Sequence, residues 1–254
     1  MTTAGQRFRA TVEYDGSAYQ GFQRQAAGIP TIQERLEASV KRIAGREVTV
    51  IGAGRTDSGV HATGQVVSFS FNWTHSAADL QRAINAYLPT DIAVLQVTAV
   101  AADFHPRFDA RWRAYRYTIY NGKQRRPLKA RYSWHVAHPL DVEVMNEAAK
   151  CLVGTHDFAT FGQPPQGTNT VRELFEANWS QKDETLFFEV RANAFLYRMV
   201  RSLVGSLKAV GCGQWRVDEF EAAFRAAARQ RAAATAPPEG LVLTAVGYDD
   251  KEDN

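Results

Sequence analysis

The stretch Gly52-Ala-Gly-Arg-Thr-Asp-Ser-Gly-Val-His-Ala-Thr-Gly64 lies between two segments that predict β-strands, residues 48–51 and 65–71. Its four glycines predict a tight turn, because glycine tolerates positive φ and close approach of other backbone. One carboxylate, Asp57, stands near the middle, two residues from the guanidinium of Arg55. Both a structural turn and a catalytic loop fit these residues, so other features of the chain have to separate the two hypotheses.

Two nucleotide-binding templates do not fit this turn. In a G-x-G-x-x-G pattern that starts at Gly52, the third glycine would fall on Asp57, and the turn leads into a predicted strand, not a helix. The pair Gly54 and Gly59 has P-loop spacing, but Val60-His61 follows where Lys-Ser or Lys-Thr is required. A dinucleotide and a P-loop phosphate are therefore not expected here.

The sequence shows no other familiar pattern of catalytic or metal-binding residues. The six histidines are scattered, and the spacing of their one close pair, His135 and His138, suits a strand or turn better than a tetrahedral metal centre. No Ser-His-Asp or Cys-His arrangement is evident, and the flanks of Asp57 offer no second acid of the kind a glycosidase needs. We expect no metal and no cofactor, and a single carboxylate that works alone.

Composition predicts a soluble cytoplasmic protein. At 254 residues the chain can form one large domain or two of ordinary size. It has no apolar run of about 18 residues, as a membrane span would need, and its first residues lack the apolar core of a signal peptide. Cys151 and Cys212 match no metal or redox spacing, which favours two reduced thiols.

Basic residues are concentrated in one part of the chain. The segment 249–253 holds four acids and one base, and the rest carries 29 basic and 23 acidic side chains, a net charge of +6. Nine Lys or Arg and one acid lie between Arg107 and Arg131, among several tyrosines. Cations mixed with aromatics occur on surfaces that bind phosphates and stack bases, although a solvated face has the same composition.

The order strand–helix–strand–strand–helix–strand occurs twice along the chain. Thr31 and Glu34 have the spacing of a helix capping box, Asp141 is a second predicted N-cap, and Gly45, Pro89 and Gly154 end helices. The predicted elements of the first half are a strand at 8–14, a helix from 32, strands at 48–51 and 65–71, a helix around 80–87 and a strand at 92–100. Those of the second half are a strand at 113–120, a helix from 142, strands at 174–179 and 186–192, helices around 196–207 and from 218 to the prolines at 237–238, and a strand at 241–248.

This order predicts an α+β fold of two related β-α-β-β-α-β halves, with antiparallel or mixed sheets flanked by helices. The predicted domains are residues 1–105, which carry the Asp57 turn, and residues 106–254.

Six segments of the chain resemble, in type and order, the motifs of the bacterial tRNA pseudouridine synthase A (TruA) family. They are the Asp57 turn, Glu13-Tyr-Asp-Gly-Ser-x-Tyr19-x-Gly-Phe-Gln-Arg24, Phe104-His-Pro-Arg-Phe108, Arg113-Ala-Tyr-Arg-Tyr117, Asn193-Ala-Phe-Leu-Tyr-Arg-Met-Val-Arg-Ser-Leu-Val-Gly205 and Pro238-Glu-Gly-Leu241. The resemblance spans about residues 8 to 248. Phe22 and Ser58 depart from the family pattern, in which Trp and Ala are common at these positions.

The resemblance implies a pseudouridine synthase fold with a central basic cleft, and a homodimer that binds tRNA. It implies isomerisation of uridine to pseudouridine at positions 38 to 40 of the anticodon stem-loop, without a cofactor. Asp57 would be the essential aspartate, attacking either C1′ of the ribose or C6 of the uracil of a flipped nucleotide.

By the same resemblance, Tyr115 would stack on the flipped base, and Arg201 would pair with Asp57 from the second half of the chain. Arg55 would act in base flipping or phosphate contact, and Leu241 would line the uracil pocket. Weaker predicted RNA contacts are Tyr14, Gln23, Arg24, His61, Arg107 and Arg111.

Two other functions stay open for this sequence. One is a non-catalytic RNA-binding or chaperone protein on the same scaffold. The other is a hydrolytic nucleosidase that uses Asp57 and releases free uracil.

Overall fold

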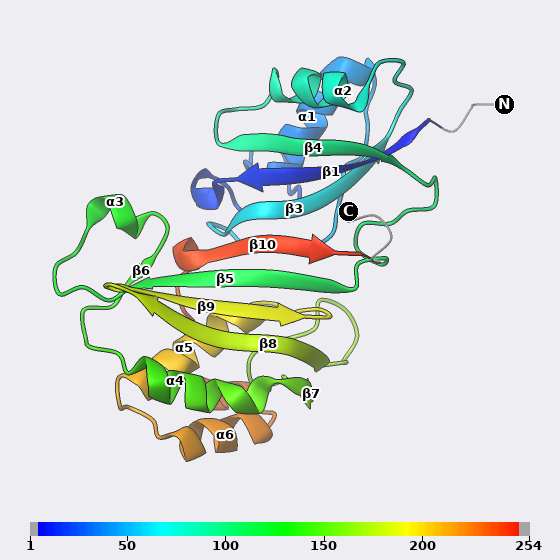
Figure 1. Ribbon diagram of the computed structural model, residues 1–254. Coiled ribbons are helices and arrows are strands. Elements are labelled where there is room, and N and C mark those ends of the chain that lie inside the picture. Colours follow the sequence, from blue (N-terminus) through cyan, green and yellow to red (C-terminus); the bar gives the residue numbers. More distant parts are fainter. Residues whose placement is uncertain (1–4, 249–254) are drawn as a thin grey trace. The chain divides into compact units, whose positions relative to one another are not determined.

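The computed structural model describes residues 5–248, so the acidic segment 249–253 lies outside the described part of the chain. Contacts divide the described residues into two units (Figure 1). Unit 1 holds the residues up to Arg111 and those from Leu243 on, and unit 2 is Trp112–Val242. The predicted boundary at residue 105 lies in the same connection, but the last strand, β10 (Leu241–Gly247), begins in unit 2 and continues in unit 1.

Unit 1 is built on an antiparallel sheet. Strand β1 (Arg7–Tyr14) pairs with β3 (His61–Ser70) on one side and with β4 (Ile92–Val100) on the other. A two-residue strand, β2 (Ile51–Gly52), pairs with β3. Alternate side chains of β1 are buried, from Phe8 to Tyr14, as expected for a sheet with one covered face.

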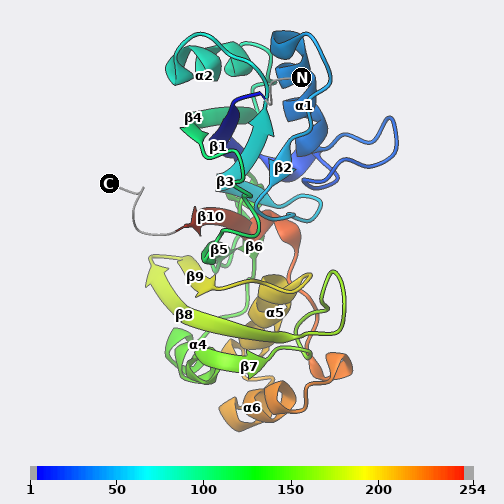
Figure 2. The same cartoon turned by 90° about the vertical axis from the view of Figure 1, so that its right-hand side faces the viewer.

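Two helices of unit 1 pack against each other, and the second packs along β4 (Figures 1 and 2). Helix α1 (Ile32–Ala44) begins after Thr31, whose side chain accepts from the backbone N–H of Glu34, and ends at Gly45 in the left-handed conformation. Helix α2 (Ala77–Asn85) begins with a capping box between Ser76 and Asp79. The predicted start and end of α1 are confirmed.

Unit 2 has a mixed sheet. Strands β5 (Trp112–Tyr120), β9 (Thr185–Ala192), β8 (Val171–Lys182) and β7 (Gly154–Asp157) pair antiparallel in that order, and β6 (Trp134–His135) pairs parallel with β5. Helices α4 (Val142–Ala149), α5 (Met199–Gly211) and α6 (Val217–Arg225) pack on one another, with α4 on β8 and α5 on β5. A short helix, α3 (Pro127–Ala130), lies between β5 and β6. The α+β fold with antiparallel and mixed sheets is thus confirmed, whereas α3, β6 and β7 were not predicted.

The predicted strand at residues 48–51 is wrong for its first three residues. The backbone N–H of Val50 donates to Oε1 of Glu37, and its carbonyl accepts from Nε2 of Gln33, so side chains of α1 take the place of a strand partner. At the other end of the turn, β3 begins at His61, four residues earlier than predicted. The irregular part of the predicted turn is therefore shorter, about residues 53–60.

The last predicted helix is too long. It ends at Arg225, not at the prolines, because residues 229–235 are tied to α5 by side chains. The guanidinium of Arg229 donates to Oγ of Ser202, and Oγ of Ser206 accepts from the backbone of Ala233. Among the residues that the structure describes, no helix is long and apolar enough to cross a membrane.

Gly205 permits the close packing of residues 229–235 on α5, because a Cβ at this position would lie 1.9 Å from the carbonyl oxygen of Ala234. We expect Gly205→Ala to lower the free energy of unfolding by about 1–3 kcal/mol through overpacking. Helix propensity alone would raise it by about 1 kcal/mol. Urea denaturation measures the difference, with the slope m expected to stay constant.

The control is Ala222→Gly at an exposed position of α6, which isolates helix propensity and should cost about 1 kcal/mol. A Gly205→Ala protein more stable than the wild type would contradict the packing described for α5.

Candidate active-site loop

The turn that carries Asp57 is short and closed. Its carbonyl oxygen accepts a hydrogen bond from the N–H of Val60 at 3.2 Å, and Gly59 inside this turn has φ +77°. Asp57 thus begins a four-residue reverse turn, with its side chain partly exposed, while Thr56 and Val60 on either side are buried. The carboxylate is held at the edge of a packed turn.

A buried hydrogen-bond network fixes the residues immediately before Asp57. The hydroxyl of Tyr14, on β1, lies 2.8 Å from Oγ1 of Thr56. Nε2 of Gln65, on β3, donates to that hydroxyl at 3.4 Å and to the carbonyl of Gly54 at 3.2 Å. Burial raises the pKa of Tyr14 to about 12, although its bonds with Thr56 and Gln65 oppose the shift. Tyr14 is therefore a neutral hydroxyl near pH 7.

Close backbone approach involves Gly64 of the quoted stretch, where a Cβ would lie 2.1 Å from the carbonyl oxygen of Thr244, and two glycines outside the stretch. Gly16 and Gly21 lie between β1 and α1, and a Cβ at Gly16 would lie 2.0 Å from the carbonyl oxygen of Val60. Gly21 has φ +92°, and its Cβ would lie 2.7 Å from the carbonyl oxygen of Thr56. By contrast, a Cβ at Gly54 would meet no atom within 4 Å. Space is open beside Gly54, whereas the other side of the turn is packed.

His61 belongs to the structural support of the turn. Its Nδ1 accepts from the N–H of Gly16 at 3.1 Å and lies 3.1 Å from Oδ1 of Asp15. The imidazole is buried, as is the side chain of Tyr14. Burial favours support of the turn over direct RNA contact for both residues, and their predicted RNA contacts stay predictions.

The exposed residues near the turn differ in their partners. Within the described residues, the exposed side chains of Arg55 and Gln23 make no hydrogen bond or ion pair, which leaves them available to an external ligand. Arg24 lies 2.9 Å from the carboxylate of the buried Glu37, which also holds the N–H of Val50. Arg24 therefore stabilises the connection between α1 and β2, a role that its position in the sequence does not reveal.

A second turn of unit 1 presents an aromatic ring that the sequence analysis did not single out. Phe108 is 75% exposed, stacks on His105 with 4.2 Å between ring centroids, and has the Arg107 guanidinium 5.9 Å from its ring centroid. Nδ1 of His105 accepts from the backbone N–H of both Arg107 and Phe108, which holds the turn in shape. Arg111 is exposed just beyond this turn. The sequence signal was an aromatic flanked by two arginines.

Unit 2 carries the other predicted site residues. Tyr115 lies on β5, partly exposed, with its ring edge-on to Phe195 at 5.0 Å between centroids. Arg201 lies on α5, where its Nε donates to the carbonyl of Ala236 at 2.8 Å. Leu241 is buried at the start of β10. Asp57 belongs to unit 1, and its predicted partnership with Tyr115 and Arg201 stays a prediction.

Other catalytic chemistry finds little support in the described part of the chain. No group of three or more His, Cys, Asp or Glu side chains there is placed to hold a metal ion. Burial raises the pKa of the Cys151 thiol to about 11, so this cysteine is protonated near pH 7 and is a poor nucleophile.

Comparison with known sequences identifies the family of this chain. A family model described as tRNA pseudouridine synthase matches residues 10–109 and 148–249. Proteins named tRNA pseudouridine synthase A from Thermoanaerobacter sp. (strain X514), Rhodospirillum rubrum and Neisseria gonorrhoeae are 41%, 43% and 42% identical. The alignments cover 93%, 95% and 97% of this chain and 97%, 87% and 94% of those proteins.

Among solved structures, a chain of a Cbf5-Nop10-Gar1 complex matches with a TM-score of 0.39 and 15% identity, over 94% of this chain and 50% of that one. So low a score carries no argument about the site. The family model covers most of the chain, and the relatives match it over nearly its whole length. The chain belongs to the tRNA pseudouridine synthase family.

Proposed function

We propose that this protein isomerises uridine to pseudouridine at positions 38 to 40 of the tRNA anticodon stem-loop, with Asp57 as the catalytic carboxylate. As a member of its family, the chain is an isomerase that acts on tRNA. The observation that carries the proposal for Asp57 is its place on a partly exposed turn that buried hydrogen bonds hold in shape.

The reaction needs one nucleophile and no redox partner. The Asp57 carboxylate attacks C1′ of the ribose or C6 of the uracil, and the bond between N1 and C1′ breaks. The uracil turns and forms a bond between C5 and C1′. The bond from Asp57 breaks as C5 displaces the carboxylate from C1′ or, in the other route, as the carboxylate is eliminated from C6. C5 loses its proton and N1 gains one. Atoms and electrons balance within the nucleotide, so the proposal includes no cofactor.

The packed turn keeps the carboxylate in place while the nucleotide moves. A catalytic group held by neighbours reorganises little in the transition state, which lowers the barrier. Tyr14 and Gln65 contribute here as positioning residues, since their bonds end on Thr56 and Gly54 and not on the substrate. The open space beside Gly54 would admit RNA to the turn.

The proposed roles of the unit 2 residues follow the family motif. Tyr115 stacks on the uracil, Arg201 orients the charged carboxylate of Asp57, and Leu241 contacts the base. Partial exposure of Tyr115 supports a stacking role, since a flipped base must be held by its face. The proposed reaction therefore draws on residues from both predicted halves of the chain.

Basic and amide side chains at the surface of unit 1 are proposed to bind the RNA backbone. Arg55 and Gln23 have no side-chain hydrogen bond or ion pair within the described chain, and Arg107 and Arg111 flank the exposed ring of Phe108. Phe108 is proposed to stack on an unpaired base next to them. A homodimer and a cytoplasmic location complete the proposal.

We expect Asp57→Asn to reduce the rate of pseudouridine formation by a factor of about 10³ or more, because the amide is a poor nucleophile. Binding of tRNA should change by less than about threefold, since the substitution keeps the shape of the turn. Single-turnover release of tritium from tRNA labelled at C5 of uridine measures the rate, and filter binding measures affinity.

The control is Ser58→Ala on the same turn, which removes a hydroxyl that donates to the carbonyl of Tyr19 and to Oε1 of Gln20 and should keep the rate within about threefold. Full activity in Asp57→Asn would contradict the catalytic role. Release of free uracil by the wild type would instead indicate a nucleosidase, and tRNA binding without any turnover would indicate a non-catalytic RNA-binding protein.

Tyr14→Phe should lower the free energy of unfolding by about 1–2 kcal/mol, because it leaves Thr56 without its buried partner. It should also reduce kcat more than it changes the Kd for tRNA, since Tyr14 is only 2% exposed. Tyr19→Phe is the matched control, because it removes one hydroxyl that bonds Asp91 instead of the turn. An equal loss of kcat in both variants, or a loss of affinity only in Tyr14→Phe, would argue against the positioning role.

A further inference from the structure

We propose that residues 122–132, which we call the α3 loop, form an RNA phosphate-binding surface in unit 2 that adds to the residues assigned above. The proposal rests on the proposed function, because it takes tRNA as the ligand. It is carried by the charge of the loop, by the lack of internal partners for three of its cations, and by a cavity at its base that two of these cations line.

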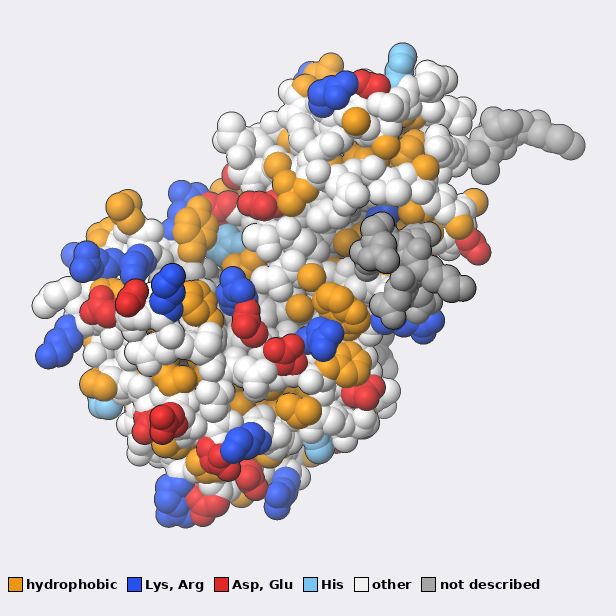
Figure 3. All heavy atoms as spheres, in the orientation of Figure 1, with side chains coloured by type: hydrophobic (Ala, Val, Ile, Leu, Met, Phe, Trp, Pro, Cys, Tyr) orange, Lys and Arg blue, Asp and Glu red, His pale blue; other side chains and the backbone are white. Residues whose placement is uncertain are grey.

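The α3 loop is basic throughout. It contains five Lys or Arg and no acid, and its residues from Lys123 to Tyr132 are all exposed. Figure 3 shows Lys and Arg side chains gathered where Figure 1 places α3. Such a cluster creates a positive field that attracts a polyanion and raises its rate of association.

Several surface cations elsewhere in unit 2 have a carboxylate partner, although Lys182, Arg198 and Arg231 have none within the described residues. Lys150 pairs with Glu147, Arg216 with Asp218, Arg225 with Glu221, and Arg116 with Glu189.

In contrast, Lys123, Arg125 and Arg126 make no side-chain hydrogen bond or ion pair within residues 5–248. Three neighbouring cations without an ion-pair partner repel one another, and an external anion would relieve this repulsion.

The base of the loop is held by side-chain hydrogen bonds and a cation–ring contact. Nδ2 of Asn121 donates to the carbonyls of Val136 and His138, and its Oδ1 accepts from the N–H of Leu140. Lys129 Nζ lies 4.6 Å from the ring centroid of Tyr120, and Ser133 donates to the carbonyl of Lys129. The three cations without partners are therefore presented from a fixed frame, which lowers the entropy lost on binding.

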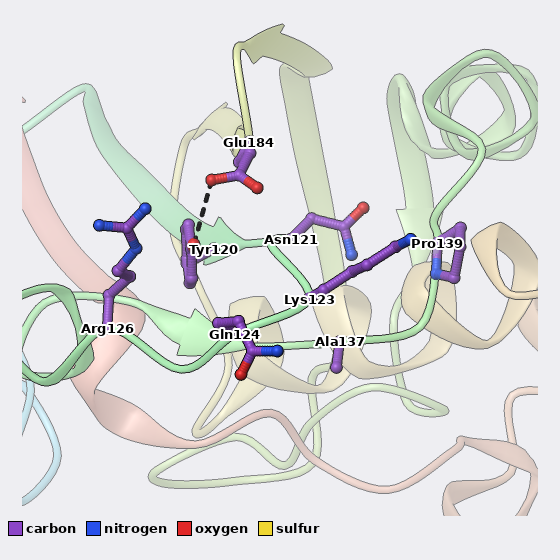
Figure 4. Close-up of a pocket in the computed structure, with 8 residues that line it drawn as sticks. All are labelled: Tyr120, Asn121, Lys123, Gln124, Arg126, Ala137, Pro139 and Glu184. Atoms are coloured by element: carbon purple, nitrogen blue, oxygen red, sulfur yellow. Dashed lines mark hydrogen bonds between the residues drawn. The ribbon is translucent and has the colours of Figure 1, made fainter.

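A cavity of about 360 Å³ opens at this base (Figure 4). It is lined by Tyr120, Asn121, Lys123, Gln124, Arg126, Ala137, Pro139 and Glu184. Lysine, arginine and amide donors suit a phosphate, and the volume exceeds that of one phosphate group. Figure 4 shows one acid among the lining residues, Glu184, which accepts a hydrogen bond from the Tyr120 hydroxyl at 3.0 Å. We infer that one backbone phosphate of the RNA occupies this cavity.

An anionic membrane is the other polyanion that a basic loop can bind. Leu128 is 94% exposed, but it is the one large aliphatic side chain of the loop. Membrane-surface segments present a broad apolar face beside their cations, and α3 has four residues. The observations favour RNA.

The test is the salt dependence of tRNA binding by the triple variant Lys123→Gln, Arg125→Gln, Arg126→Gln. Each phosphate contact adds about 0.7–0.9 to the slope of log K against log salt, so the slope should fall by about two to three. The Kd should rise about tenfold or more at 0.1 M salt. KM should rise more than kcat falls, because the loop is not assigned to the target uridine.

The matched control removes three paired cations of the same unit, with Lys150→Gln, Arg216→Gln and Arg225→Gln. It changes the net charge equally, and its slope should stay near that of the wild type. Equal effects of both triple variants, or a wild-type slope in the loop variant, would overturn the proposal.

A single substitution tests the cavity in the opposite direction. Glu184→Gln keeps an acceptor for the Tyr120 hydroxyl and removes the negative charge, so tRNA should bind about two- to threefold more tightly. An unchanged Kd would overturn the assignment of a phosphate to the cavity.

Three further outcomes separate this proposal from others. Loop-dependent binding to vesicles of equal phosphatidylcholine and phosphatidylserine, with no loop effect on tRNA, would overturn it in favour of a membrane. If the wild type binds tRNA with a loop-dependent slope but makes no pseudouridine, the α3 loop stands and the proposed function fails. If the wild type makes pseudouridine and the loop variant binds tRNA like the wild type, the α3 loop proposal is overturned and the proposed function stands.

Discussion

The contact on which the Asp57 turn and the candidate site depend is the buried hydrogen bond between the hydroxyl of Tyr14 and Oγ1 of Thr56. It joins the central strand of the sheet to the residue before Asp57, and Gln65 extends it to the carbonyl of Gly54. Gly16 packs against the carbonyl of Val60 on the opposite side of the turn, where a Cβ would not fit. A partly exposed acid on an irregular turn keeps one position because its neighbours are packed and paired.

The elements that the sequence predicted correctly depend on interactions between residues close together in the chain. Helix α1 begins at Thr31 and ends at Gly45 because caps depend on residues close in sequence. The strand at 92–100 matches β4, since alternation is a local property. The errors have a different cause. The residues around Val50 predict a strand, but the backbone of Val50 bonds to side chains of α1. Residues 229–235 predict the continuation of a helix, but side chains tie them to α5. In both places contacts between residues far apart in sequence override the local sequence pattern.

The same distinction holds for the candidate site. The sequence predicted the turn and its acid because closely spaced glycines indicate a turn from the local sequence alone, and Asp57 is the one carboxylate among them. The supporting roles of Tyr14, His61 and Arg24 were not, because each depends on a partner that the fold brings near. Which side chains are exposed is likewise known only from the structure. It shows that Phe108 is exposed on its hydrogen-bonded turn, and that three cations of the α3 loop have no partner within the described residues.

The most direct test of the central claim is to map pseudouridine, nucleotide by nucleotide, in an unmodified tRNA transcript incubated with the purified protein. The account predicts pseudouridine at uridines 38 to 40, with no free uracil released and no change in the length of the RNA. Pseudouridine confined to another region of the tRNA would contradict the proposed substrate site. No pseudouridine at all, with tRNA bound, would contradict the isomerase mechanism assigned to Asp57.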